Sequence, residues 1–257
     1  MIFLSSYLSR EIFGWYLFPI LLLIGWSPTF ESSDTNPYWG NEIESESSSS
    51  QDVVASGLYM GREIARTMHW RGADWLVRET RESEEDTSLM LRQLQIRPGQ
   101  VVCDLGSGNG YHTLRMARLV SPTGRVIATD LQPQMLEMLS ERALLESISN
   151  IETRESEVDD PNLPESQIDL VLMADVYHEF SFPAEILKKV YASLKAQGLV
   201  ALLEFRGEDP EVPIKPLHKM SKKQIKLELE ANGFRLVRSF DGLPWQHLMF
   251  FGKLTRE

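Results

Sequence analysis

The sequence predicts an α/β fold around one mostly parallel sheet of seven strands, five parallel strands followed by a C-terminal antiparallel hairpin. Three observations predict it: a buried strand ends in a glycine-rich turn at residues 106–110, strands then alternate with helices, and a short turn joins the last two strands. The chain has 257 residues, 42% of them hydrophobic, which suffices for one large domain with its own core.

The first of these elements is the stretch VVCDLGSGNG at residues 101–110. Apolar residues of the predicted strand surround one carboxylate, Asp104. Gly106, Gly108 and Gly110 then remove the side chains at alternate positions, so we expect a ligand to approach bare backbone N–H groups there. A strand, a glycine-rich turn and the start of a helix together are typical of a nucleotide-type binding site.

Strands and helices alternate regularly after this turn. The patterns predict helices over residues 111–120, 132–145, 183–194 and 222–233, and strands over residues 125–129, 151–156, 168–174 and 198–205. Pro133 fits the first turn of its helix. Ser221 and Gln224 form a capping box at the start of the last helix.

The last two predicted strands distinguish a sheet with an antiparallel end from an all-parallel sheet. Residues 234–240 and 245–252 both read as strands, and only a short turn around Gly242 and Pro244 joins them. A parallel pair needs a crossover of a dozen or more residues, so these two strands must be antiparallel.

Residues 58 to about 95 are predicted to form a helical preface to the sheet, because apolar residues recur at helical spacing. Within it, the stretch MHWRGADW at residues 68–75 has two interpretations. It is a surface helix whose tryptophans fill the core and whose neighbouring charges pair. Alternatively, it is a lid over the ligand, with Trp70 or Trp75 as a wall.

The N-terminus has a different character. Residues 12–26 are uncharged and almost wholly apolar, with Arg10 before them, which is shorter than a typical membrane span and close to a signal-peptide core. We therefore expect residues 1–30 to be a signal peptide or a membrane anchor, so that the protein is membrane-anchored or exported to the periplasm. Translation starting near Met60 would instead leave it cytoplasmic. Residues 31–57 are serine-rich and acidic, and we expect a disordered linker there.

Composition excludes several functions. The net charge of −11 argues against nucleic acid as a partner and favours a small molecule. The one cysteine, Cys103, lies inside the central strand, where a buried and inert thiol is expected. The five histidines show no metal-ligand spacing, so no metal is expected. The chain has neither a nucleophile elbow nor a Walker loop, which argues against serine hydrolysis and phosphoryl transfer.

The wording DLGSGNG resembles the first motif of the class I S-adenosylmethionine (SAM) dependent methyltransferases, a Rossmann-like family whose seven-stranded sheet ends in an antiparallel hairpin. This resemblance covers residues 94–254 and implies SAM as the cofactor. The motifs GADWL, YHEF, EDP and WQH, over residues 58–253, also resemble a family of bacterial predicted methyltransferases that often follow an export signal. The dinucleotide fingerprint G-x-G-x-x-G fits less well, because Tyr111 is a poor fit where helix and strand should pack closely.

The resemblance implies a set of cofactor-binding residues at the strand ends. They are Asp104, Gly106, Ser107, Gly108, Asn109, Gly110, Asp130, Leu131, Asp159, Asp160 and Ala174. Asp130, at the tip of the second strand, would accept both ribose hydroxyls, and its alternative role is a helix cap. Asp159, or Asp160 beside it, would face the adenine amino group, and a solvated acidic turn is the alternative. Asp104 would face the ammonium group of the cofactor or support the turn.

The acceptor pocket is expected at the ends of the fourth and fifth strands. The catalytic candidates are His178, Tyr177, Glu204 and His218. His178 is the first candidate for a general base because the pKa of histidine lies near working pH, and its alternative role is a hydrogen-bonded structural histidine.

Together these features predict a methyltransferase that transfers a methyl group from SAM to a small-molecule acceptor. Two alternatives stay open, an NAD(P)-dependent oxidoreductase and a catalytically silent binding or scaffold protein with the same fold.

Overall fold

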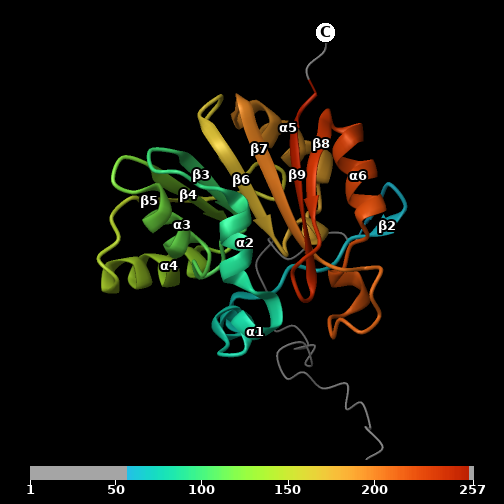
Figure 1. Ribbon diagram of the computed structural model, residues 1–257, viewed down its shortest axis with the longest axis horizontal. Coiled ribbons are helices and arrows are strands. Elements are labelled where there is room, and N and C mark those ends of the chain that lie inside the picture. The colour runs from blue at the N-terminus through green and yellow to red at the C-terminus, as the bar shows by residue number, and fades with distance from the viewer. Residues whose placement is uncertain (1–56, 255–257) are drawn as a thin grey trace, which may run out of the picture. The chain divides into compact units, whose positions relative to one another are not determined.

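The computed structural model describes residues 57–254, and the expected signal peptide or anchor and nearly all of the expected linker lie outside them. A sheet of seven strands in the order β5-β4-β3-β6-β7-β9-β8 forms its centre (Figure 1). The strands are β3 (Val101–Leu105), β4 (Arg125–Asp130), β5 (Ile151–Glu155), β6 (Ile168–Ala174), β7 (Leu194–Phe205), β8 (Phe234–Phe240) and β9 (Gln246–Lys253). Strands β3 to β7 pair in parallel, and β9 runs antiparallel to both β7 and β8. The predicted fold class is therefore confirmed.

The helices are short and lie between the strands. They are η1 (Trp70–Val77), α1 (Arg81–Glu85), α2 (Thr87–Leu94), α3 (Thr113–Val120), α4 (Pro133–Leu145), η2 (Tyr177–Glu179), α5 (Pro183–Ser193), η3 (Pro216–His218) and α6 (Lys222–Ala231), where η denotes a 3₁₀-helix. The Ser221 hydroxyl accepts a hydrogen bond from the Gln224 N–H at 3.1 Å, which confirms the predicted start of α6. Within residues 57–254, no helix combines the length and the apolar character needed to span a bilayer.

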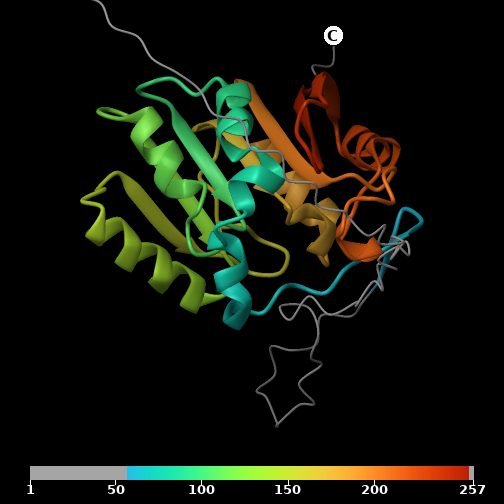
Figure 2. The ribbon, with the colours of Figure 1, turned by 60° about the horizontal axis from the view of Figure 1, so that its bottom comes forward.

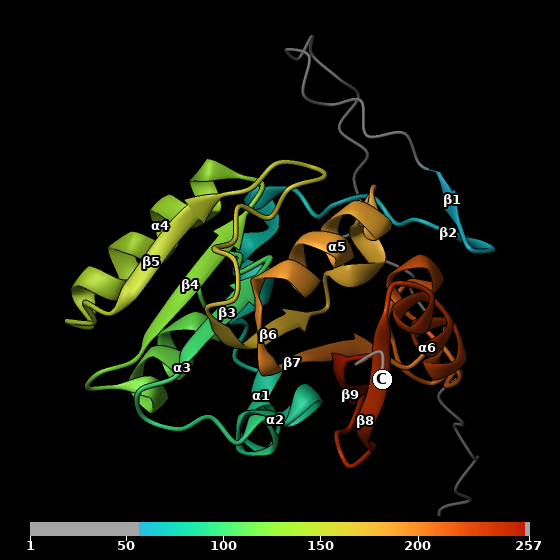
Figure 3. The same cartoon turned by 90° about the horizontal axis from the view of Figure 1, so that it is seen from above.

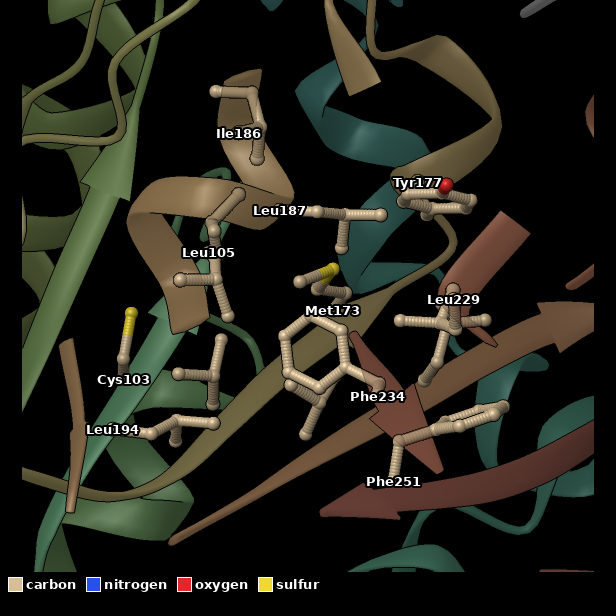
Figure 4. Close-up of a cluster of buried hydrophobic side chains, with 14 of the residues drawn as sticks. Cys103, Leu105, Met173, Tyr177, Ile186, Leu187, Leu194, Leu229, Phe234 and Phe251 are labelled. Carbon is tan, nitrogen blue, oxygen red and sulfur yellow. The ribbon is translucent and has the colours of Figure 1, made fainter. Parts of the chain in front are cut away.

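Apolar side chains fill both faces of the sheet. On one face, α5 and α6 pack against β3, β6, β7 and β9, with Leu187, Leu229 and Phe251 among the buried side chains (Figure 4). On the other face, α2 and α3 cover β3, β4 and β7, and α4 packs beside α3. Figure 3 shows α5 and α2 on opposite sides of the sheet. The continuous apolar runs predicted for the central strands follow from this burial on both faces.

The register brings four strand ends to one edge. Asp104 of β3 pairs with Ala128 of β4 and with Leu172 of β6, and Ala174 of β6 pairs with Leu203 of β7. These four parallel strands therefore end side by side. The connections run in opposite directions from β3, to β4 on one side and to β6 on the other. In open α/β sheets a ligand binds in the crevice outside the strand ends at such a point.

The preface to the sheet differs from the prediction in its first part. Instead of a helix, β1 (Leu58–Tyr59) and β2 (Arg62–Glu63) form a small antiparallel hairpin. Met60 and Gly61, at its turn, both have positive φ, and Gly61 (φ 94°) has a conformation that favours glycine. The predicted helix is wrong here because a two-residue hairpin turn interrupts the spacing, and the helical part begins only at Trp70.

An extended segment connects this hairpin to η1 across the end of the sheet (Figure 2). The Ala65 N–H donates to the His178 carbonyl at 3.1 Å. The Trp70 N–H donates to the Gln132 side chain at 2.7 Å. The preface is therefore attached to the same edge at which β3, β4, β6 and β7 end.

One buried carboxylate fastens the hairpin to the domain. Glu228 of α6 is fully buried and pairs with the Arg62 guanidinium, with Nε to Oε1 at 2.7 Å and Nη2 to Oε2 at 3.1 Å. The Tyr177 hydroxyl and the Gln224 amide donate to the same carboxylate at 2.8 and 2.9 Å. Three separate parts of the chain therefore depend on Glu228.

Candidate functional site

The glycine-rich turn after β3 is closely fitted to its surroundings. Gly106, Gly108 and Gly110 have φ values of 75°, 52° and 85°, which lie in the left-handed region. A Cβ atom at Gly106 would lie 2.5 Å from Cγ2 of Val176, and one at Gly110 would lie 2.1 Å from Cδ1 of Leu139. Both conformation and space therefore require glycine at these two positions.

The backbone N–H groups of the turn are largely used within the chain. The N–H groups of Gly106 and Ser107 both donate to the Thr129 carbonyl at 2.9 Å. The Gly108 N–H donates to Asp130 Oδ2 at 2.9 Å. The expectation of bare N–H groups is wrong for these three residues, because the hydrogen bonding between β3 and β4 continues into the turn. At these three positions the turn offers a ligand close approach to the backbone and no free N–H donor.

Asp130 lies at the end of β4, as predicted. Its Oδ1 accepts from the Gln132 N–H at 2.9 Å, so the capping role that was the alternative is present. Burial raises the pKa of Asp130, although the backbone N–H groups around it act to lower that pKa. A carboxylate has about four acceptor positions, and the Gly108 and Gln132 N–H groups occupy two of them. The role in binding hydroxyls is therefore compatible with the capping role.

Asp104 lies beneath the turn. Its carboxyl group is buried and accepts a hydrogen bond from the Thr113 hydroxyl at 2.5 Å. Burial raises the pKa of Asp104 to about 6, against the opposing effects of the Thr113 hydrogen bond and of the Arg81 charge. The group therefore changes its charge in the pH range in which the protein can be studied.

The 3₁₀-helix η1 lies over the glycine-rich turn. The Asn109 amide donates to the Ala73 carbonyl at 3.0 Å. A Cβ atom at Gly108 would lie 2.6 Å from Cδ1 of Leu76. Trp75 packs against the apolar cluster of Phe205, Val212 and Ile214. The segment thus has the covering position of the predicted lid.

A chain of buried polar groups forms where β6 and β7 end. His178 Nδ1 lies 2.6 Å from Glu204 Oε2, and His178 Nε2 lies 3.0 Å from His218 Nδ1. Glu204 is fully buried and His178 is 2% exposed. The structure thus brings together three of the four predicted catalytic residues.

Glu179 completes this cluster and was not among the predicted site residues. Its Oε1 lies 3.8 Å from His178 Nε2 and 3.7 Å from His218 Nδ1. Burial raises the pKa of Glu179 to about 7, while the charge of His178 acts to lower it. The stretch YHEF was singled out in the sequence, but the direction of each side chain could not be read from it. We call His178, Glu179, Glu204 and His218 the histidine cluster.

The pKa values of the two histidines of the cluster are shifted in opposite directions. Burial acts to lower the pKa of His178, but the charge of Glu204 and its hydrogen bond outweigh burial, and the pKa is raised. Burial and the nearby charge of His178 lower the pKa of His218 to about 3. Of the two histidines, His178 therefore has the higher affinity for a proton, and Glu204 compensates the charge that a proton brings.

Tyr177 is not part of the cluster, contrary to the prediction. Its ring packs with the apolar side chains between α5 and α6 (Figure 4), and its hydroxyl donates to Glu228. Successive side chains of a 3₁₀-helix point about 120° apart. Neighbouring residues of η2 therefore face different surroundings.

The predicted adenine-binding residues lie on the surface. Asp159 is exposed, and Asp160 Oδ2 pairs with Lys189 of α5 at 2.7 Å. Leu131, directly after Asp130, is 37% exposed. Ala174 ends β6 and is partly exposed. The pairing with Lys189 leaves Asp159 as the better candidate of the two acidic residues.

A second group of buried polar residues, which the sequence did not predict, lies next to the strand ends. The Gln246 amide, at the start of β9, donates to Asp175 Oδ2 at 2.6 Å and to Glu85 Oε2 at 3.4 Å. Asp175 Oδ1 and Gln246 Oε1 are buried with no hydrogen-bond partner among the described residues. Buried polar atoms of this kind are expected to have a partner, such as a ligand or water.

Comparisons with known proteins agree on one family. Residues 96–246 match the family model described as "Methyltransferase domain". The ubiquinone/menaquinone biosynthesis C-methyltransferase UbiE of Ectopseudomonas mendocina (strain ymp) is 28% identical over 111 residues, which are 43% of each chain. The protein of the same name from Hydrogenovibrio crunogenus (strain DSM 25203 / XCL-2) is 32% identical over 111 residues, 43% of this chain and 44% of that one. The match thus spans less than half the length of these curated relatives.

The fold is also found among solved structures. A SAM dependent methyltransferase from Aquifex aeolicus superposes with a TM-score of 0.68 and 23% sequence identity. The alignment covers 72% of this chain and 98% of that chain. This likeness concerns the fold.

Proposed function

The chain belongs to the methyltransferase domain family, and we propose that it transfers a methyl group from SAM to a small-molecule acceptor. One observation carries the proposal. The glycine-rich turn with Asp130 and the histidine cluster lie at the same edge of the sheet, and Gly106 packs directly against Val176, two residues before His178. A cofactor held at the turn is therefore next to a group that can take up a proton.

The residues at the turn fit SAM. Ser107 Oγ is buried with no hydrogen-bond partner among the described residues, and the Asp130 carboxylate retains acceptor positions for ribose hydroxyls. Asp104 brings a carboxyl group beneath the same turn, suited to a cationic ligand. When bound, SAM supplies an activated methyl group on a positively charged sulfur. Asn109, Leu131, Ala174 and Asp159 would complete the contacts.

The acceptor would bind next to the histidine cluster. We assign His178 the uptake of the proton that the acceptor loses, with Glu204 compensating the charge that forms on the imidazole. Positioning of the acceptor next to the turn supplies much of the remaining rate enhancement. The relatives named as ubiquinone/menaquinone C-methyltransferases support an aromatic quinone precursor as the first acceptor class to test.

Calorimetric titration of the full chain with SAM tests the cofactor assignment. We expect SAM to bind with micromolar affinity and Asp130→Ala to weaken it about 10- to 100-fold, the loss of one or two hydrogen bonds to a charged group. Asp160→Ala is the matched control, because that carboxylate is already paired with Lys189, and it should leave the affinity unchanged.

Two comparison ligands separate the alternatives in the same experiment. S-adenosylhomocysteine should bind at the same site, and NAD should not compete. Tighter binding of NAD than of SAM would establish the oxidoreductase instead. Folded protein that binds neither ligand would favour the silent scaffold.

The affinity for SAM is expected to depend on pH through Asp104. Its pKa of about 6 lies above the ordinary aspartate value of 3.8, so the carboxyl group is mostly neutral below pH 6 and mostly charged above it. The ammonium group of SAM stays protonated below pH 7, so it meets a carboxylate only at the higher pH. We expect about tenfold tighter binding at pH 7 than at pH 5. Calorimetry at the two pH values measures this, and Asp104→Asn should remove the difference. Equal affinities for the unchanged protein would show that Asp104 does not contact the cation.

A further inference from the structure

We propose that His178, Glu179 and His218 form a binding site for a divalent transition-metal ion of the zinc type. One ligand atom from each residue converges on the same place, and all three atoms lie within 4.8 Å of one another. The separations are 3.0 Å between His178 Nε2 and His218 Nδ1, and 3.8 and 3.7 Å from these nitrogens to Glu179 Oε1.

This triangle has the size that a metal ion requires. A point in its plane lies about 2.1 Å from all three atoms, which is the usual length of zinc–nitrogen and zinc–oxygen bonds. Two imidazole nitrogens and one carboxylate oxygen are a donor set found at zinc and at non-haem iron sites.

Glu204 provides a second and independent indication. Metal-binding histidines almost always donate their other ring N–H to a carboxylate, a carbonyl or water, which orients the ring toward the ion. His178 has this arrangement, because its Nδ1 lies 2.6 Å from the fully buried Glu204 while Nε2 faces the other two ligand atoms. A metal ion would also compensate the two buried carboxylates of Glu179 and Glu204.

The fold holds the third ligand in place. His218 lies 40 positions after His178 and ends η3 in the proline-rich loop after β7. The Met220 N–H donates to the Phe205 carbonyl at 3.0 Å, and Arg206 and Met220 form an isolated parallel β-bridge. These contacts hold the two ends of the loop together next to the end of β7. Chain spacing between histidines could not reveal this site.

The competing interpretation is a shared proton. One of the two ring nitrogens can carry a hydrogen and donate it to the other at 3.0 Å, so an N–H···N hydrogen bond accounts for this contact without a metal ion. A metal site binds one equivalent of a metal ion, whereas a hydrogen bond between the two histidines binds none. An ion with three protein ligands keeps a coordination position open for water or for an oxygen atom of the acceptor. This role toward the acceptor rests on the proposed function, whereas binding of the ion does not.

The test uses the full chain freed of metal with a chelator and titrated with Co²⁺ and with Zn²⁺. We expect one equivalent of either ion to bind, and Co²⁺ to give the visible absorption of a site with four or five ligands. His218→Gln and Glu179→Gln should weaken binding at least 100-fold, and Glu204→Gln should weaken it about 10- to 100-fold. The matched controls are His69→Gln and Glu165→Gln, since both side chains are exposed, and neither should change the affinity.

Binding of less than one equivalent, or equal binding by the unchanged protein and His218→Gln, would overturn the metal site and leave the shared proton. Folding of each variant is checked by circular dichroism, and the Co²⁺ spectrum of the unchanged protein decides the matter if a variant does not fold. Calorimetry with SAM is run on the same samples. Metal binding without SAM binding would contradict the proposed function alone, and SAM binding without metal binding would contradict the metal site alone.

Discussion

His178→Ala is expected to lower kcat by a factor of about 10² to 10⁴, the usual contribution of a group that takes up a proton in the reaction. His178 is the residue of the cluster in contact with all the others, through Nδ1 to Glu204 and through Nε2 to His218 and Glu179. Without a metal ion its loss removes the proton acceptor. With the proposed ion on Nε2 its loss removes a metal ligand instead, because Nδ1 is bonded to Glu204 and no ring nitrogen is then left to take up a proton. The measurement is the formation of S-adenosylhomocysteine with demethylated quinone precursors as acceptors.

The affinity for SAM should change little in His178→Ala, because His178 belongs to the acceptor side of the site. Glu204→Gln should give a smaller loss of kcat, about 10- to 100-fold, since glutamine keeps the hydrogen bond to His178 and removes only the charge. Glu165→Gln, at an exposed glutamate, is the control and should keep full activity. If His178→Ala keeps more than a tenth of the activity, His178 is a structural histidine, the alternative that the sequence left open.

Glu228→Ala is expected to lower the free energy of unfolding by about 3 to 5 kcal/mol, as does removal of one partner of a buried ion pair. The Arg62 guanidinium would lose both of its hydrogen bonds to the carboxylate, and the buried Tyr177 hydroxyl would lose its acceptor. Urea denaturation followed by circular dichroism measures the change. Loss of the Arg62 contact should also expose the β1–β2 hairpin to proteolysis before the rest of the domain unfolds.

Glu230→Ala is the matched control on the same helix. Glu230 pairs with Lys226 at 3.7 Å, and both side chains are about half exposed, so its removal should cost less than about 1 kcal/mol. Equal losses in the two variants would mean that helix propensity, and not the buried network, explains the effect of Glu228→Ala.

Much of the fold followed from patterns between residues close together in the chain. The apolar run of β6 and the short turn before β9 predicted a central parallel strand and an antiparallel end, and both are present. The cap at Ser221 and the glycines of the turn were equally local signals. These features depend on backbone geometry and on burial of whole faces, which a short stretch of sequence determines.

Two predictions were wrong because the local pattern suited more than one structure. The spacing of Met60, Ile64 and Met68 suited a helix, but the chain turns at Gly61 and continues extended. The YHEF stretch contained both His178 and Tyr177, and the 3₁₀ turn directs one to the cluster and the other to the core. The orientation of this short turn determines which of its side chains faces the cluster and which faces the core.

The alternation of strands and helices, the glycine-rich turn and the residues near the strand ends could all be read from the amino-acid order. The meeting of Glu179 and His218 at His178, with Glu204 behind them, could be seen only in the folded chain. The reason is the register of β6 and β7 and the closure of the loop after β7, since both join residues far apart in the chain. Hydrogen bonding between strands and burial of the sheet fix the distances within the histidine cluster, and no periodic pattern in the sequence reveals them.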